Sequence, residues 1–112
     1  MDKVTLSLSR AELSALRMHL DMVCSTQTPS QLRADGVGGG FVYECLRMRA
    51  TLLARLLVRL NITSVMVKDK YRVHIPVEQC FALLAEWHEP ACASQRMGVL
   101  RVTVGRIDQA LA

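Results

Sequence analysis

A long apolar run free of charge, which would indicate a membrane span, is missing from this 112-residue sequence. Its most apolar stretch, residues 41–60, has about the length of a span. That stretch carries five charged side chains: Glu44, Arg47, Arg49, Arg55 and Arg59. So many charges exclude a simple spanning helix, and we expect no membrane partner. The first residues also lack a basic stretch followed by an apolar run, so we expect no secretory signal.

Closely paired cysteines are also missing. The four cysteines lie far apart, at Cys24, Cys45, Cys80 and Cys92, and no Cys-x-x-Cys pair occurs. A chain large enough to build a core does not need disulfides, so we expect reduced thiols and a cytoplasmic protein. One set of residues has a faint metal-ligand spacing: His74, Cys80, His88 and Cys92. Because zinc sites usually draw on closely spaced ligand pairs, we predict no metal and no other cofactor.

Signatures of catalysis are equally scarce. The glycine-rich segment before Phe41 lacks the third glycine of a dinucleotide fingerprint and the Lys-Ser or Lys-Thr pair of a phosphate-binding loop. Cys45 lies one turn before Arg49, but a cysteine within an apolar helical stripe is usually packed. Glu86 and Glu89 lie at a helix end that looks exposed, which disfavours paired acid and base chemistry. We therefore predict that the protein is not an enzyme and has no small-molecule substrate.

The composition favours one folded domain. Hydrophobic residues make up 51% of the chain and charged residues 21%, which is enough apolar material for one packed core. We expect a single domain over residues 1–112. Residues 26–40 contain Pro29 and four glycines, so we expect a flexible Gly-rich loop there.

Hydrophobic periodicity predicts the elements on either side of this loop. Residues 3–9 alternate between apolar and polar side chains, which is typical of a strand with one buried face. Ser9 and Glu12 fit a capping box at the start of a helix. Residues 41–60 form a long helix whose apolar surface is wider than one buried face requires. We therefore expect this helix to contact neighbours on two sides.

The second half of the chain predicts a hairpin followed by two helices. Val65 and Val67 would form one strand and residues 71–75 the next, with a turn near Asp69 and Lys70. Pro76 suits the first position of a helix. The last segment has a strand-like run at 99–104, but its apolar residues recur at steps of three and four, which favours a helix. These residues are Met97, Leu100, Val104, Ile107 and Leu111.

The predicted fold class is therefore α+β. We expect a small three-stranded, mainly antiparallel sheet covered on one face by about four helices. The expected order is strand, helix, helix, strand, strand, helix, helix.

Positive charge is concentrated in the middle of the chain. Between residues 47 and 72 lie seven basic residues and one acid, whereas the whole chain has a formal net charge of +4. This asymmetry suggests an anionic partner, and the predicted open sheet face is polar and basic. Aromatic residues are 4% of the chain and none is expected on that face, so stacking of single-stranded bases is unsupported. The candidate contacts to an anion or nucleic acid are Arg59, Lys68, Lys70, Arg72 and His74.

Heptad-like spacing indicates self-association as the other hypothesis. Leu46, Leu53 and Leu60 lie seven residues apart, and Arg49 and Leu56 fill the intermediate positions. Arg49 would meet either a carboxylate of another subunit or an anionic ligand, or it would pack its stem and extend its head into water. The candidate interface residues are Arg49, Leu53, Leu56, Leu100, Val104 and Ile107.

Two functions follow from these patterns. The first is a structural or interaction protein that self-associates, as a homodimer, through its apolar helices. The second is a nucleic-acid-binding accessory protein that uses the basic sheet face. The apolar pattern is more extensive than the basic surplus, so the sequence ranks self-association first.

Overall fold

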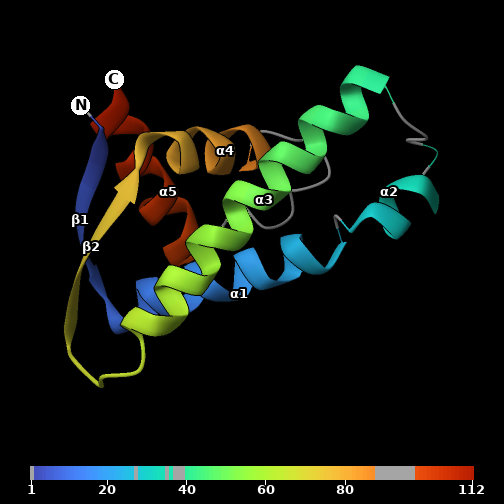
Figure 1. Ribbon diagram of the computed structural model, residues 1–112. Helices are drawn as coiled ribbons and strands as arrows, with labels where there is room; N and C mark the ends of the chain where they lie inside the picture. The colour runs from blue at the N-terminus through green and yellow to red at the C-terminus, as the bar shows by residue number, and fades with distance from the viewer. Residues whose placement is uncertain (1, 27, 35, 37–39, 88–97) are drawn as a thin grey trace.

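The sheet of this protein is a two-stranded antiparallel ribbon. The computed structural model describes residues 2–26, 28–34, 36, 40–87 and 98–112, and in these ranges β1 (Lys3–Ser9) pairs with β2 (Lys70–Pro76). Thr5 lies opposite His74 and Ser7 lies opposite Arg72. The strands are far apart in sequence but adjacent in space (Figure 1), so they form a ribbon without a hairpin turn.

Five helices in the described residues lie on one side of this ribbon (Figure 1). Their bounds are α1 (Arg10–Thr26), α2 (Pro29–Ala34), α3 (Gly40–Thr63), α4 (Val77–Trp87) and α5 (Gly98–Leu111). The α+β class is confirmed, whereas the number of helices in the described residues is higher than expected. The additional helix is α2, which lies inside the segment predicted to be a loop.

The predicted third strand at residues 65–67 is wrong. Helix α3 continues to Thr63, so few residues remain to reach β2. Val65, Met66 and Val67 are instead 77%, 64% and 80% exposed in a turn. The Tyr71 hydroxyl donates to the Met66 carbonyl at 2.8 Å and accepts from the Lys68 amide at 3.0 Å. These bonds satisfy backbone groups that a sheet would otherwise pair.

The start of α1 and the whole of α5 agree with the sequence. The Glu12 amide donates to Ser9 Oγ at 3.1 Å, and the Ser9 amide donates to Glu12 Oε1 at 3.0 Å. This reciprocal capping box turns the chain directly from β1 into α1. Residues 98–111 are helical. The spacing of apolar residues by three and four positions therefore indicated the structure correctly, whereas the β-branched run at 99–104 did not.

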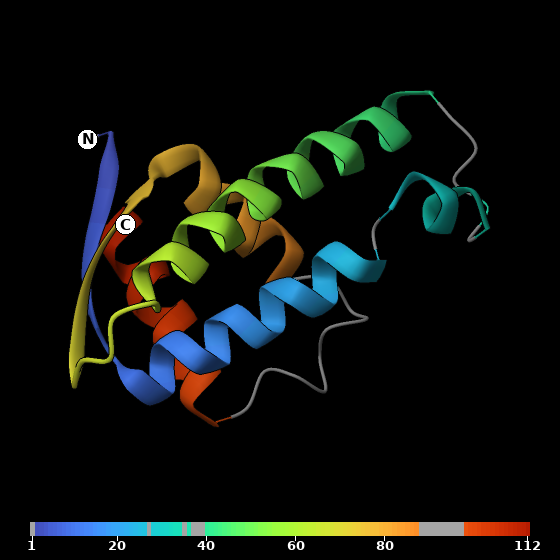
Figure 2. The same ribbon diagram turned by 60° about the horizontal axis from the view of Figure 1, so that its bottom comes forward.

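One hydrophobic core lies between the ribbon and the helices. The inner face of the ribbon contributes alternate residues of both strands, such as Leu8 and Ile75, which are fully buried. Leu16 of α1, Leu56 of α3 and Ile107 of α5 pack against them. The first half of α3 and the short α2 extend away from this core (Figures 1 and 2), which gives the molecule extents of 43 × 27 × 25 Å.

No helix in the described part of the chain is long and apolar enough to cross a membrane.

Candidate nucleic-acid interface

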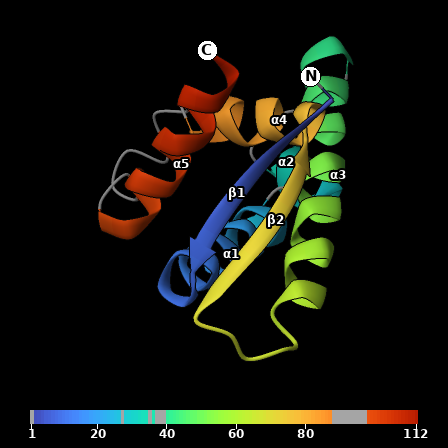
Figure 3. The ribbon, with the colours of Figure 1, turned by 90° about the vertical axis from the view of Figure 1, so that its left-hand side faces the viewer.

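The outer surface of the ribbon carries basic and hydroxyl side chains and faces away from the helices (Figure 3). We call this surface the ribbon face. It consists of the exposed residues Lys3, Thr5, Ser7, Lys70, Arg72 and His74. None of these six side chains is acidic or apolar. The surface therefore combines positive charge with short hydrogen-bonding groups.

Strict alternation in both strands produces this separation. Exposed and buried residues follow one another along Lys3–Ser9 and along Lys70–Pro76. Successive side chains of a strand point to opposite faces, so apolar residues enter the core and polar ones stay outside. In this register, Arg72 lies directly across from Ser7, and the Thr5 hydroxyl lies 2.8 Å from Nδ1 of His74.

Two arginines cover the edges of the ribbon. Arg59 of α3 donates from Nη1 to the carbonyl of His74 at 2.8 Å. Arg106 of α5 donates from Nη2 to the carbonyl of Ser7 at 2.9 Å. Exposed edge carbonyls can pair with a strand of another chain, and these bonds occupy one of them on each edge. The surface offered to a partner is therefore the face of the ribbon.

The end of the ribbon next to α1 is also basic. Arg10 donates from Nε to the Lys68 carbonyl at 3.3 Å and lies 3.7 Å from the carboxylate of Asp69. Arg10 and Asp69 are both largely exposed, so this ion pair is a weak, solvated contact. Lys68 follows the exposed turn that the Tyr71 hydroxyl holds in place.

The structure brings the five predicted anion contacts together. Lys70, Arg72 and His74 belong to the ribbon face, Arg59 covers its β2 edge and Lys68 adjoins its end. All five residues are exposed.

Four of the six predicted interface residues face the chain's own core. Leu53, Leu56 and Ile107 are fully buried and Val104 is 2% exposed, so these side chains are not available to a second copy in this fold. Leu100 is half-buried and packs against the core. Arg49 is also half-buried, and it lies on α3 in a groove beside α4.

The residues considered for metal binding or catalysis do not form a site in the described ranges. His74 points outward, whereas Cys80 is buried below the same strand with Sγ 3.8 Å from the Ile75 carbonyl. His88, Cys92 and Glu89 lie outside the described residues. No group of three potential metal ligands occurs within those ranges. Burial raises the pKa of the Cys80 thiol to about 11, so this thiol stays protonated at neutral pH.

One buried polar cluster was not predicted from the sequence. Glu86 was expected at an exposed helix end, but it is 1% exposed and its Oε2 lies 2.8 Å from Nε2 of His19. The Trp87 ring meets the His19 ring edge-on, with 5.6 Å between their centres. The helical spacing of His19 from Leu16 and Leu20 was a usable signal that it faces inward, but its partner 67 residues away was not predictable.

The glycine-rich segment has a conformational role at its described end. Gly40 begins α3 with φ of +79°, in the left-handed region that other residues rarely adopt. This geometry explains a glycine at that position without an anion.

No protein family matches this chain, and no match was found among the curated proteins or the solved structures.

Proposed function

We propose that this protein is a non-enzymatic nucleic-acid-binding protein that holds duplex DNA against its ribbon face. The observation that carries the proposal is the composition of that face, where Lys3, Lys70 and Arg72 are interleaved with Thr5, Ser7 and His74 and no carboxylate interrupts them. Phosphate oxygens accept hydrogen bonds from all of these groups, and neutralising phosphates releases counterions, which favours binding.

The shape of the ribbon favours a duplex. The major groove of B-form DNA is about 12 Å wide and admits a two-stranded β-ribbon. Two strands spaced about 4.8 Å apart, with their side chains, are compatible with that width. The groove of duplex RNA is too narrow for such entry. Single-strand binding is disfavoured, because the aromatic residue of β2, Tyr71, faces the core at 5% exposure.

Arginines beside the ribbon extend the proposed contact. Arg59 lies at the β2 edge, Arg106 at the β1 edge and Arg10 at one end. A ribbon seated in a groove has a phosphate backbone along each side, so we assign phosphate contacts to Arg59 and Arg10 and base-edge or phosphate contacts to the ribbon face. The charge of Arg106 is already paired with Glu12 at 2.9 Å.

We therefore rank nucleic-acid binding above self-association, whereas the sequence alone ranked self-association first. The residues predicted to bind an anion gather on one exposed surface, whereas most residues predicted for self-association are interior. A cytoplasmic location is part of the proposal. It is supported by the free thiols of Cys24, Cys45 and Cys80 among the described residues.

The experiment compares two exposed arginines, one on the ribbon face and one on the protruding half of α3. Binding of a fluorescein-labelled duplex DNA of mixed sequence is followed by anisotropy over a range of salt concentrations, for the wild type, Arg72→Gln and Arg47→Gln. Arg72 belongs to the ribbon face, whereas Arg47 is an exposed residue of the protruding half of α3. We expect Arg72→Gln to weaken binding and to reduce the salt slope by about one, because one phosphate contact is lost.

Arg47→Gln removes the same charge and is expected to bind as the wild type does. Absence of binding at low salt overturns the proposal. Equal losses in the two variants also overturn it, because they would indicate attraction to net charge instead of the ribbon face. Unlabelled single-stranded DNA and duplex RNA, added as competitors, test the preference for duplex DNA.

A further inference from the structure

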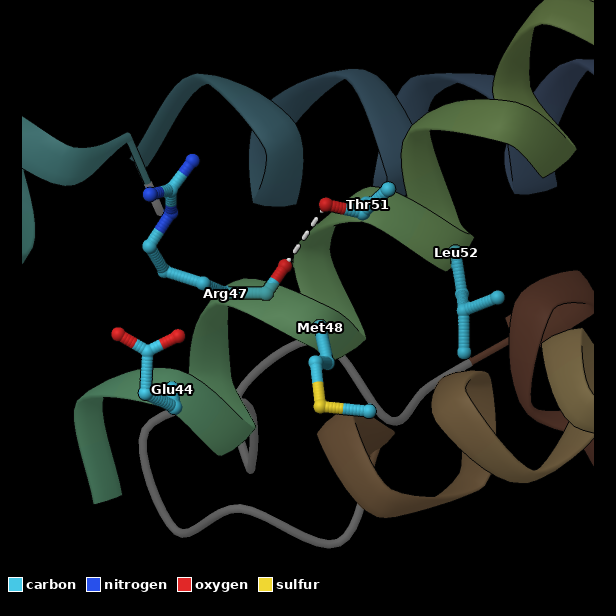
Figure 4. Close-up of a pocket in the computed structure, with 5 residues that line it drawn as sticks. All are labelled: Glu44, Arg47, Met48, Thr51 and Leu52. Carbon is cyan, nitrogen blue, oxygen red and sulfur yellow. Dashed lines mark hydrogen bonds between the residues drawn. The ribbon is translucent and has the colours of Figure 1, made fainter. Parts of the chain in front are cut away.

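A stripe of four side chains on the protruding half of α3 is largely exposed within the part of the chain that the structure describes. It consists of Phe41, Cys45, Met48 and Leu52, and we call it the α3 seam. Phe41 is 84% exposed and Met48 is 66% exposed, while Leu52 is half-buried. Met48 and Leu52 point to the same side of the helix (Figure 4). Phe81 of α4, 57% exposed, lines a groove together with Cys45 and Leu52 and enlarges this apolar surface.

The seam has the spacing of a coiled coil. Its members follow one another at steps of four, three and four residues, the step pattern of the core positions of a heptad repeat. The same helix carries the stripe of Leu46, Leu53 and Leu60, of which Leu53 and Leu60 are fully buried in the chain's own core. One heptad stripe of α3 therefore enters the core through Leu53 and Leu60, whereas the seam is exposed at Phe41, Cys45 and Met48 and reaches the edge of the core at Leu52.

Charges beside the seam make it complementary to itself. Glu44 precedes Cys45 on one flank, and Arg49 follows Met48 on the other flank. In heptad terms, they occupy a g position and the e position five residues later. In two parallel helices in register, these positions face each other across the interface, so Glu44 of one copy meets Arg49 of the other on both sides of the pair. An acidic or basic foreign helix would find one favourable flank and one repulsive flank.

We propose that the α3 seam binds a second copy of this chain, with the two α3 helices parallel and in register about a two-fold axis. Each seam residue then faces its own counterpart, so Cys45 lies opposite Cys45 and Met48 lies opposite Met48. Burial of Phe41 and Met48 drives the association, and the Glu44 to Arg49 pairs set its direction.

Cross-linking at the axis tests this geometry. A short bismaleimide adds to two thiols: each sulfur forms one thioether bond as the C=C π bond of a maleimide ring opens, and the neighbouring ring carbon takes up the proton. We expect a covalent dimer of the wild type joined between the two Cys45 residues, as identified by peptide mapping. Cys45→Ser should abolish that link. Adding Met48→Cys to Cys45→Ser should restore it, whereas adding Val58→Cys should not, because Val58 is 58% exposed but lies off the seam.

Light scattering with a charge placed in the seam gives an independent measurement. Met48→Asp should raise the dimer dissociation constant at least tenfold, because two carboxylates would face each other in an apolar interface. Met18→Asp, at a position 72% exposed on α1, is the matched control and should leave the constant unchanged. Both positions are exposed, so neither change is expected to prevent folding, and circular dichroism verifies this.

A wild type that is monomeric at high micromolar concentration overturns the proposal. Equal effects of Met48→Asp and Met18→Asp overturn it too, as does a Val58→Cys cross-link as efficient as that through Met48→Cys. The outcome is separate from that of DNA binding, because Arg72→Gln should remain dimeric whether or not the wild type binds DNA.

Discussion

Glu12 links three elements through a single carboxylate. It accepts hydrogen bonds from the Ser9 amide, from the Thr103 hydroxyl at 3.2 Å and from Arg106 at 2.9 Å. These contacts connect the end of β1 and the start of α1 to α5. The hydrogen bond from the Ser9 backbone is the largest influence that lowers the pKa of Glu12 below its ordinary value of 4.5, and Thr103 and Arg106 lower it further.

The sign of this pKa change predicts acid sensitivity. Because the pKa of Glu12 is lower in the folded state, its ionised form stabilises the fold above about pH 4.5, and that stabilisation is lost as the pH falls through the folded value. Glu12→Gln should cost about 1 kcal/mol of unfolding free energy at neutral pH and much less near pH 3. Urea titrations of both proteins at the two pH values measure this. A cost that does not change with pH would contradict the assignment.

Burial separates the cysteines in reactivity. The Cys80 thiol is fully buried with a pKa of about 11, and desolvation also raises the pKa of the half-buried Cys24. Cys45 is exposed on the α3 seam. We expect iodoacetamide to modify Cys45 rapidly in the folded monomer, at protein concentrations too low for the proposed dimer, and Cys80 only after unfolding, because the thiolate is the reactive form. Mass spectrometry of peptides over time tests the order, and rapid native modification of Cys80 would show that α4 opens readily.

At the scale of elements, α3 is anchored by its second half. Leu53, Leu56 and Leu60 are fully buried against the other helices and the ribbon, whereas between Tyr43 and Leu53 no described residue is fully buried. This division of one helix into a packed part and a protruding part gives the molecule its elongated form and exposes the seam (Figure 2).

In the packed part of α3, truncation of Leu56 and of Val58 should have clearly different costs in unfolding free energy. Leu56→Ala removes a fully buried side chain and should cost about 2–5 kcal/mol of unfolding free energy, because a cavity remains in the core. Val58→Ala, at a position 58% exposed on the same helix, should change it by about 0.5 kcal/mol or less. Chemical denaturation followed by circular dichroism compares them. Similar costs would contradict the orientation of α3.

At the scale of the whole molecule, charge and apolar surface lie on different parts. The ribbon face is basic and closes one end of the core, whereas the α3 seam lies on the extension that points away from it (Figures 1 and 3). A dimer formed through the seam would therefore leave both ribbon faces open.

Asp69, an acidic residue next to the ribbon, predicts a substitution that strengthens DNA binding, in contrast to Arg72→Gln. Asp69 is fully exposed at the end of β2 and repels phosphate, so Asp69→Asn should strengthen duplex binding. Because both charges are fully solvated and screened by salt, we expect only a small gain in affinity, roughly twofold. Asp21→Asn makes the same change in net charge on α1 and should have a smaller effect. Anisotropy at low salt measures both, and equal gains would show that position is unimportant.

Local patterns predicted most of the elements correctly. Alternation placed Val73 and Ile75 inside and Arg72 and His74 outside, and the Ser9 to Glu12 spacing located the start of α1. The error at Val65 and Val67 has a physical reason. An alternation of apolar and polar residues also occurs in exposed turns, so the pattern alone does not identify a strand. The hydrogen bonds that stabilise this turn come from the hydroxyl of Tyr71, which belongs to the strand that follows the turn.

The sequence by itself determined which residues share a face, because the periods of a helix and a strand are properties of the local backbone. It therefore established the basic face of β2 and the heptad stripe of Leu46, Leu53 and Leu60 in α3. Tertiary structure alone decided that Leu53 and Leu60 are buried in the chain's own core, because that depends on where α1, α4 and α5 pack. It also decided that β1 pairs with β2 and that Glu86 meets His19, since such contacts join residues more than sixty positions apart.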